Sequence, residues 1–283
     1  MKNTTAEALE KEIDRLAAAN PHIAPLLQAF GPLLVEKELW LQHTAPAAPA
    51  AIDEDRFRTG VALIQQGPLF TEDDPWQSAG LTVAHAIGRG FPLFADEMAK
   101  WAEEIEAGAD CYSLLDGGPA SETEDSPSRK LFLEFLARFM LTRMARAMAP
   151  KLAPLPWNKG YCPVCAGLPH LALLRDKGQR FLQCSHCSHE WAFSRLTCPA
   201  CDHQDPQNSQ ILFIEGHKED SIFTCGKCQS YLITGDRSGS LGTINADLIA
   251  MSLVPLDFIA QEKGFLPIAT CPWNTLPSTV EKD

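Results

Sequence analysis

The first half of the chain carries apolar residues at helical spacing. Leu9, Ile13 and Leu16 recur along one face, and Thr4 with Glu7 fits a capping box that would begin this helix, which ends near Asn20. The same periodicity predicts further helices over residues 21–42, 53–65, 74–87, 93–107 and 126–149. An all-helical N-terminal half is therefore expected.

Prolines divide this half of the chain. Pro25 and Pro32 predict that the segment 21–42 is broken into two pieces, because proline inside a helix removes a backbone hydrogen bond. Residues 44–51 are small and proline-rich, which is typical of a connector. The segment 126–149 has a wide apolar stripe, which indicates the core of a bundle more than a binding groove. Prolines between residues 150 and 156 then place a domain boundary near Leu155.

The pattern changes to short apolar runs in the second half. Residues 171–175 and 179–182 are predicted to form a hairpin with Gly178 at its turn, and residues 211–214 and 221–224 a second hairpin. Residues 245–261 favour a short helix, kinked at Pro255. Strands thus follow helices along the chain, which predicts an α+β fold.

Four Cys-x-x-Cys pairs lie among these short strands and hold eight of the ten cysteines. Two residues between cysteines allow one tight turn to aim both sulfurs at a single point, so each pair can supply half of a tetrahedral thiolate site. Sequential pairing leaves 18 residues between Cys165 and Cys184 and 23 between Cys201 and Cys225, enough for a hairpin in each case. We therefore expect two metal sites, with the ligands Cys162, Cys165, Cys184 and Cys187 in the first and Cys198, Cys201, Cys225 and Cys228 in the second.

Other chemistries are compatible with cysteine pairs. Four structural disulfides would need an oxidising compartment, and dithiol redox motifs usually occur singly beside a strand-helix unit. Iron and zinc both accept four thiolates in tetrahedral geometry, so the spacing does not distinguish them. His186 and His189 flank Cys187, but each site already has four sulfurs. Cys111 and Cys271 stand apart and are assigned no role.

Four strings within this region resemble the formate dehydrogenase accessory protein FdhE family, a group of cytoplasmic maturation factors for respiratory formate dehydrogenases. The strings are Tyr161-Cys-Pro-Val-Cys-Ala-Gly-Leu-Pro169, Leu182-Gln-Cys-Ser-His-Cys-Ser-His-Glu-Trp191 with Arg195, Cys198-Pro-Ala-Cys201 and Cys225-Gly-Lys-Cys-Gln-Ser-Tyr-Leu232. They cover about a quarter of the chain closely. A helical half followed by a cysteine-rich half is similar to the architecture of the family over nearly the full length.

The resemblance implies a function. A protein of this family would bind the catalytic subunit of a respiratory formate dehydrogenase before export, without being an enzyme itself. It would carry iron in two rubredoxin-like sites, which would be structural and potentially redox-active. Zinc in the same sites would only stabilise the fold. Trp191 and Arg195 match the motif of the family, which makes them candidates for partner binding as well as for local packing.

Charge and targeting signals limit the alternatives. The formal net charge is −12, and the cysteine-rich half has no basic excess, which argues against the phosphate contacts of a nucleic-acid-binding zinc ribbon. The N-terminus lacks the apolar core of a secretory signal, and the most apolar segment, 131–148, is interrupted by charged residues. We expect a cytoplasmic protein that is not inserted in a membrane, in which the cysteines stay reduced.

These observations predict an α+β multidomain protein. Its expected parts are an all-α domain (1–155), two tandem rubredoxin-like or zinc-ribbon four-cysteine domains (156–195 and 196–243) and a C-terminal helix and tail (244–283). We expect a monomer or homodimer that binds the formate dehydrogenase catalytic subunit and no nucleic acid. A zinc-ribbon protein that binds nucleic acid or another protein, and a dithiol oxidoreductase, remain the alternatives.

Overall fold

The computed structural model describes residues 5–115, 126–175, 178–214, 217–238 and 245–274 of the chain. The chain forms two compact units. Residues 1–51 and 67–153 make up the first, and residues 52–66 and 154–283 the second. A segment of the N-terminal half, 52–66, thus packs with the cysteine-rich half. The division of the chain into separate folding domains stays a prediction.

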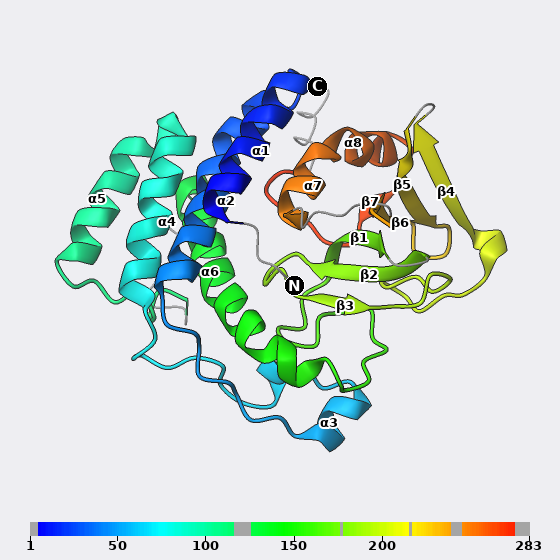
Figure 1. The fold of residues 1–283 in the computed structure, drawn as a ribbon, viewed down its shortest axis with the longest axis horizontal. Helices are drawn as coiled ribbons and strands as arrows, with labels where there is room; N and C mark the ends of the chain where they lie inside the picture. The colour runs from blue at the N-terminus through cyan, green and yellow to red at the C-terminus, as the bar shows by residue number, and fades with distance from the viewer. Residues whose placement is uncertain (1–4, 116–125, 176–177, 215–216, 239–244, 275–283) are drawn as a thin grey trace, which may run out of the picture. The chain divides into compact units, whose positions relative to one another are not determined.

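The described part of the first unit is helical, as expected, and its helices pack side by side (Figure 1). Leu27, Leu33, Phe132 and Phe139 are among the fully buried side chains of its core. Thr5 caps the first helix by accepting a hydrogen bond from the backbone N–H of Ala8, whereas the predicted cap, Thr4, lies outside the described residues. The helices are α1 (Ala6–Ala19), α2 (Ala24–His43), α4 (Trp76–Gly90), α5 (Ala95–Glu106) and α6 (Pro127–Leu152).

Helix α2 runs without interruption through Pro32, so the predicted break is wrong. Pro25 lies in the first turn, where a helix needs no backbone donor, whereas Pro32 removes one interior hydrogen bond. Close packing accounts for the continuity. A Cβ at Gly90 of α4 would meet the Ala29 carbonyl oxygen at 1.9 Å, so the two backbones touch here. Contacts with α1 and α4 therefore outweigh the lost hydrogen bond.

Helix α6 is the core helix of the first unit, as its apolar stripe predicts. Its apolar residues are buried on most sides. The buried Arg143 donates from its guanidinium to the Ala45 carbonyl of the connector at 2.8 Å and to the Asp74 carboxylate, just before α4, at 2.7 Å. A charged hydrogen-bonded pair thus fixes a segment that has no helix or strand of its own.

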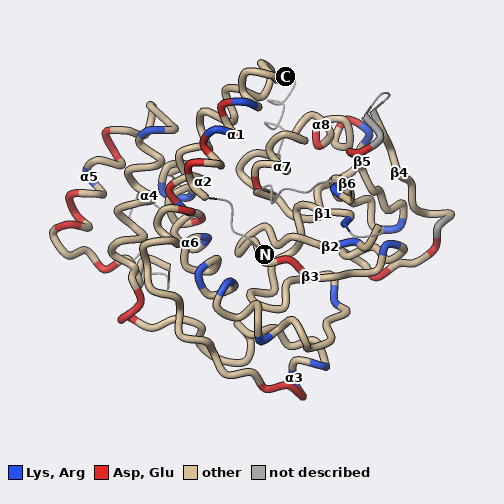
Figure 2. The backbone as a smooth tube through the Cα atoms, in the orientation of Figure 1, with Lys and Arg blue, Asp and Glu red and all other residues tan. Residues whose placement is uncertain are grey.

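Acidic residues recur along α1 and α5 (Figure 2). Both helices place acids in their first turn, where the helix dipole favours negative charge. On α1, Lys11 pairs with Glu7 at 2.6 Å, but both side chains are exposed, so the pair adds little stability.

The second unit is built on one sheet of seven strands among the described residues. Both predicted hairpins are present, as β1 with β2 and as β4 with β5. They join because β1 pairs in parallel with β6, giving the order β3-β2-β1-β6-β5-β4, with β7 added beside β6. The strands are β1 (Pro169–Arg175), β2 (Gln179–Cys184), β3 (Glu190–Ala192), β4 (Ser209–Ile214), β5 (His217–Cys225), β6 (Ser230–Asp236) and β7 (Leu266–Pro267).

Two short helices cover one face of this sheet (Figure 1). The expected helix over 245–261 is divided at Leu253 into α7 (Ala246–Ser252) and α8 (Val254–Glu262), with Pro255 in the first turn of α8. Their apolar side chains pack against Leu171, Ile222 and Ile233 of the sheet. The sheet thus buries one face under helices.

The segment 52–66 lies against the first cysteine pair. Helix α3 (Glu54–Thr59) ends at Gly60, whose φ of 101° is left-handed, so the helix is shorter than the predicted 53–65. A 3₁₀ turn follows, in which Leu63 N–H donates to the Pro163 carbonyl at 2.9 Å and Ile64 N–H to the Val164 carbonyl at 3.0 Å. The turn between Cys162 and Cys165 is therefore held from outside by a distant part of the chain.

Candidate metal centres

The four Cys-x-x-Cys pairs adopt a common turn. The residue after each second cysteine has a left-handed φ of 54° to 59°, although none is glycine. In three of the turns the first cysteine N–H donates to the carbonyl five residues later, at 2.8 to 2.9 Å. This backbone reversal brings both sulfurs of a pair to the inside of the turn. The left-handed residues are Ala166, Ser188, Asp202 and Gln229.

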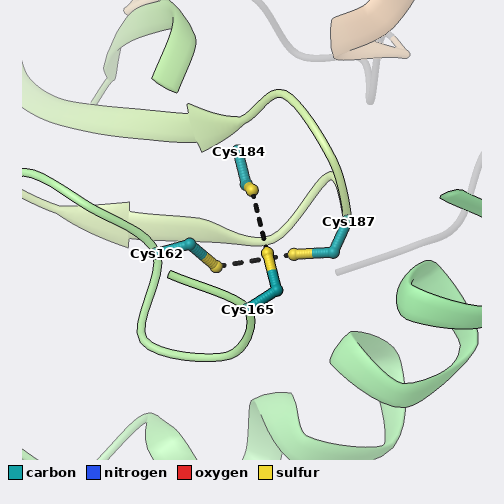
Figure 3. Close-up of side chains that lie close together, drawn as sticks. All are labelled: Cys162, Cys165, Cys184 and Cys187. Atoms are coloured by element: carbon teal, nitrogen blue, oxygen red, sulfur yellow. Dashed lines mark hydrogen bonds between the residues drawn. The ribbon is translucent and has the colours of Figure 1, made fainter. Parts of the chain in front are cut away.

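The first predicted site has its four sulfurs pointing toward one another (Figure 3). Cys162 Sγ lies 3.4 Å from Cys187 Sγ, and Cys165 Sγ lies 3.4 Å from Cys184 Sγ. Backbone N–H groups of Val164 and His186 lie 3.4 Å from the sulfurs of Cys162 and Cys184. These four cysteines form a group that could hold a metal ion, in which Cys162, Cys184 and Cys187 are buried and Cys165 is half-buried.

The second predicted site has the same arrangement with more exposure. Cys198 Sγ lies 3.7 Å from Cys228 Sγ, and Cys201 Sγ lies 3.8 Å from Cys225 Sγ. Cys198 and Cys225 are buried under Phe223, whereas Cys201 and Cys228 are half-exposed. The two sites therefore share a donor set and differ in their access to solvent.

Both sulfur sets fit a tetrahedral metal ion. A metal–sulfur bond of about 2.3 Å gives a tetrahedron with sulfurs about 3.8 Å apart. Within each set, all four sulfurs lie within 4.8 Å of one another. The closest distance, 3.4 Å, is far beyond the about 2.05 Å of a disulfide, and no disulfide joins any of the ten cysteines, all of which lie in the described residues. Each of these short sulfur–sulfur distances joins cysteines of two different Cys-x-x-Cys pairs, as expected when two pairs share one four-ligand site.

Burial makes a cation necessary if these sulfurs are to be thiolates. Burial raises the pKa of the Cys162 and Cys187 thiols well above the usual range, and it also raises the pKa of Cys198. At Cys228 burial acts in the same direction, but hydrogen bonds from Ser230 and neighbouring thiols bring the pKa down to about 7. Four like charges gathered in a buried volume are costly, so a bound metal ion would supply the compensating charge.

Comparisons with known proteins agree with this site. A family model described as "FdhE, central domain" matches residues 161–195, which contain the whole first site. The Protein FdhE homolog of Aquifex aeolicus is 34% identical over 116 residues, which are 40% of this chain and 41% of that protein. The homolog of Haemophilus ducreyi is 25% identical over 268 residues, covering 90% of this chain and 84% of that protein. The chain is similar to FdhE proteins.

The fold is also that of a solved FdhE structure. The FdhE protein from Pseudomonas aeruginosa superposes with a TM-score of 0.58 at 21% identity, covering 93% of this chain and 92% of that one. The matched lengths are uneven, since some FdhE homologs, such as that of Haemophilus influenzae, align over only 36% of their own length. In the described parts of this chain, no helix is long and apolar enough to span a membrane.

The histidines and remaining cysteines stay outside both sulfur sets. His186 hydrogen-bonds the Cys165 sulfur from the edge of the first site, and burial lowers the pKa of His189 to about 4. Cys111 is buried, which raises its pKa to about 11. Cys271 Sγ lies 3.2 Å from His170 Nδ1 in the C-terminal segment. Among the described residues, the two groups of side chains that could bind a metal ion are made up of the eight paired cysteines.

Trp191 and Arg195 have different surroundings in this structure. Trp191 is 5% exposed, and its indole N–H donates to the Lys159 carbonyl at 3.0 Å. Arg195 is exposed and donates to the Gly178 carbonyl at 3.2 Å. Their role in partner binding stays a prediction, and burial leaves Trp191 little surface to offer a partner.

One residue near the second site was not singled out by the sequence. Arg180 of β2 is 3% exposed, and its guanidinium lies 5.3 Å from the Phe193 ring centroid and 5.6 Å from that of Phe223. It donates to the Thr197 carbonyl at 2.7 Å. Burial lowers its pKa to about 10, so it remains charged at neutral pH. The sequence signal was an arginine inside a predicted strand, which is weak on its own.

Proposed function

We propose that this chain is a metal-carrying accessory protein that binds the catalytic subunit of a respiratory formate dehydrogenase in the cytoplasm while that enzyme is assembled. The proposal is carried by the two four-sulfur sites built into one sheet, together with the FdhE central-domain match at the first site. In this role the protein is not an enzyme. Its metal sites shape the surface that meets the partner.

We further propose iron as the metal in both sites. Cys162, Cys165, Cys184 and Cys187 would hold one ion, and Cys198, Cys201, Cys225 and Cys228 the other. Tetrathiolate iron supplies one-electron redox chemistry, whereas zinc in the same donor set supplies none. The protein contributes turns that fix the sulfurs and burial that shields the first site from solvent.

Metal analysis of protein purified without oxygen tests the metal assignment. We expect about two irons per chain, with thiolate-to-iron charge-transfer absorption after oxidation. Two zinc ions and no visible absorption would replace iron by zinc and leave the partner proposal in place. Protein that takes up neither metal would contradict the sites themselves.

Co-purification with a formate dehydrogenase catalytic subunit tests the partner. The intact protein should retain the subunit, and the Cys162→Ser/Cys165→Ser variant should lose it, because the first site would be empty. Cys111→Ala is the matched control, since this buried cysteine lies in the first unit and outside both sulfur sets. Absence of binding by intact, metal-loaded protein would refute the proposed function.

A further inference from the structure

We infer that Arg180 is a positioning residue and counter-charge for the second four-cysteine site. The inference rests on the proposed metal occupancy of that site. It assigns to β2, which ends at a cysteine of the first site, a role in holding the metal of the second.

The surroundings of Arg180 are aromatic. The guanidinium lies between the rings of Phe193 and Phe223, and its contact with both rings is a cation–π arrangement. Its Nε–H has no hydrogen-bond partner among the described residues, although the side chain is buried. Among the described residues, the guanidinium donates one hydrogen bond, and a buried cation with so few partners is stabilised by a nearby negative charge.

The second site supplies that charge. Phe223 packs directly against Cys198 and Cys225, and Arg180 lies over the same ring. A thiolate at Cys198 would raise the pKa of Arg180, against the larger lowering effect of burial. A divalent ion bound by four thiolates keeps an excess of negative charge, so the site and Arg180 stabilise one another.

A hydrogen bond from Arg180 also positions the cysteine turn of the second site. Arg180 donates to the carbonyl of Thr197, the residue immediately before Cys198. The guanidinium therefore fixes the start of the turn that carries Cys198 and Cys201. Such outer contacts orient metal ligands and strengthen metal binding. The contribution matters most at the second site, because two of its cysteines are half-exposed.

Zinc release to a chelating dye tests this role in the full chain. Arg180→Met keeps an apolar side chain without the charge, and Arg180→Lys keeps the charge without the planar fork. We expect wild-type protein to release two equivalents of zinc, and Arg180→Met to release one of them roughly tenfold faster, with the other unchanged. Arg180→Lys should release zinc close to the wild-type rate. Cys198→Ser identifies the equivalent that belongs to the second site.

The outcomes separate this inference from the proposed function. Wild-type protein that takes up neither zinc nor iron would overturn the metal sites, and this inference with them. Two bound ions whose release Arg180→Met leaves unchanged would overturn the inference alone. Equal acceleration by Arg180→Lys and Arg180→Met would also overturn it, because the charge would then have no part. If Arg180→Met does not fold, a wild-type release rate in folded Arg180→Lys supports the counter-charge, and accelerated loss contradicts it.

Discussion

The cysteine turns place non-glycine residues in a backbone conformation that side chains disfavour. Ala166, Ser188, Asp202 and Gln229 all have φ between 54° and 59°. A left-handed residue with a Cβ costs roughly 1–2 kcal/mol, and short polar side chains reduce this cost through local hydrogen bonds. Ala166 has no polar group for such compensation. The strain is therefore least compensated in the first turn of the first site.

Ala166→Gly should stabilise the protein. Removing the Cβ relieves the left-handed strain, while the added freedom of the unfolded chain offsets part of the gain, so about 1 kcal/mol is expected. Denaturant unfolding at a fixed free zinc concentration measures the change. Ala172→Gly, at an extended position of β1, is the matched control and should destabilise. A loss of stability in Ala166→Gly would contradict the assigned strain.

A second single-residue feature is a carboxyl buried beneath α8. Asp257 is 4% exposed, and Tyr231 Oη donates to its Oδ1 at 2.7 Å. Burial raises the pKa of Asp257 to about 7, against the lowering effect of the Tyr231 hydrogen bond. The folded protein therefore holds a proton that the unfolded chain has already lost at mildly acidic pH.

Stability should accordingly fall as pH rises toward 7. The contribution of Asp257 is fully present below the ordinary pKa of a carboxyl and is lost as pH approaches about 7, at most about 1.4 kcal/mol per pH unit. Asp257→Asn, which stays neutral, should remove this slope. Unfolding free energies of both proteins between about pH 5.5 and 7.5 check it, a range chosen around the shifted pKa. Parallel profiles would show that Asp257 is ionised throughout.

The residues that could be read from the sequence are those whose chemistry is local. The spacing of the cysteine pairs predicts the metal sites, because a single turn forms each half-site. Arg180 and Asp257 depend on partners distant in the chain, Thr197 and Tyr231, which only the folded sheet brings near. The local sequence around a single arginine or aspartate does not predict its burial, so the roles of Arg180 and Asp257 became apparent only from the structure.

At the scale of elements, the junction between residues 52–66 and the first cysteine turn stands out. Phe57 packs on Trp157 with ring centroids 4.6 Å apart, and Tyr161 Oη donates to the Gly60 carbonyl at 2.6 Å. With the two backbone hydrogen bonds from Leu63 and Ile64, this segment closes over the turn. Metal bound at the first site should therefore protect it.

Amide hydrogen exchange can measure that protection. The amides of Leu63 and Ile64 should exchange slowly in metal-loaded protein and faster after chelation, because the Pro163 and Val164 carbonyls that accept from them lie within the cysteine turn. Amides of α4, in the first unit, serve as the control and should keep their protection. If chelation leaves the exchange rates of residues 63–64 unchanged, the stability of this segment does not depend on metal at the first site.

Element boundaries show where local patterns stop being sufficient. Helices α1, α5 and α6 follow their apolar periodicity, and both hairpins follow their turns. Pro32 was expected to break α2, but the close approach of α4 keeps the helix whole. The parallel pairing of β1 with β6 was not expected, since these strands are separated by the entire second hairpin. Such long-range pairing leaves no local signal.

At the scale of the whole molecule, the two metal sites share one sheet while the helical unit has its own core. Leu171 of β1 pairs with Ile233 of β6, so the strands of the first site and those of the second site form one continuous hydrogen-bonded sheet. The ribbons also share one apolar cluster with α7 and α8. Since small four-cysteine folds draw much of their stability from metal, this unit should depend on both ions.

Chelation should therefore unfold the second unit and spare the first. Buried Leu27, Phe132 and Phe139 lie in a helical core, and the described residues of this unit include none of the cysteines that could hold a metal, so helical circular dichroism should persist after metal removal. Limited proteolysis followed by mass spectrometry should place new cleavage sites in 52–66 and 154–274, and added metal should restore protection. Equal cleavage within α2 and α4 would mean that both units unfold together. Protection throughout would mean that the sheet does not need its metals.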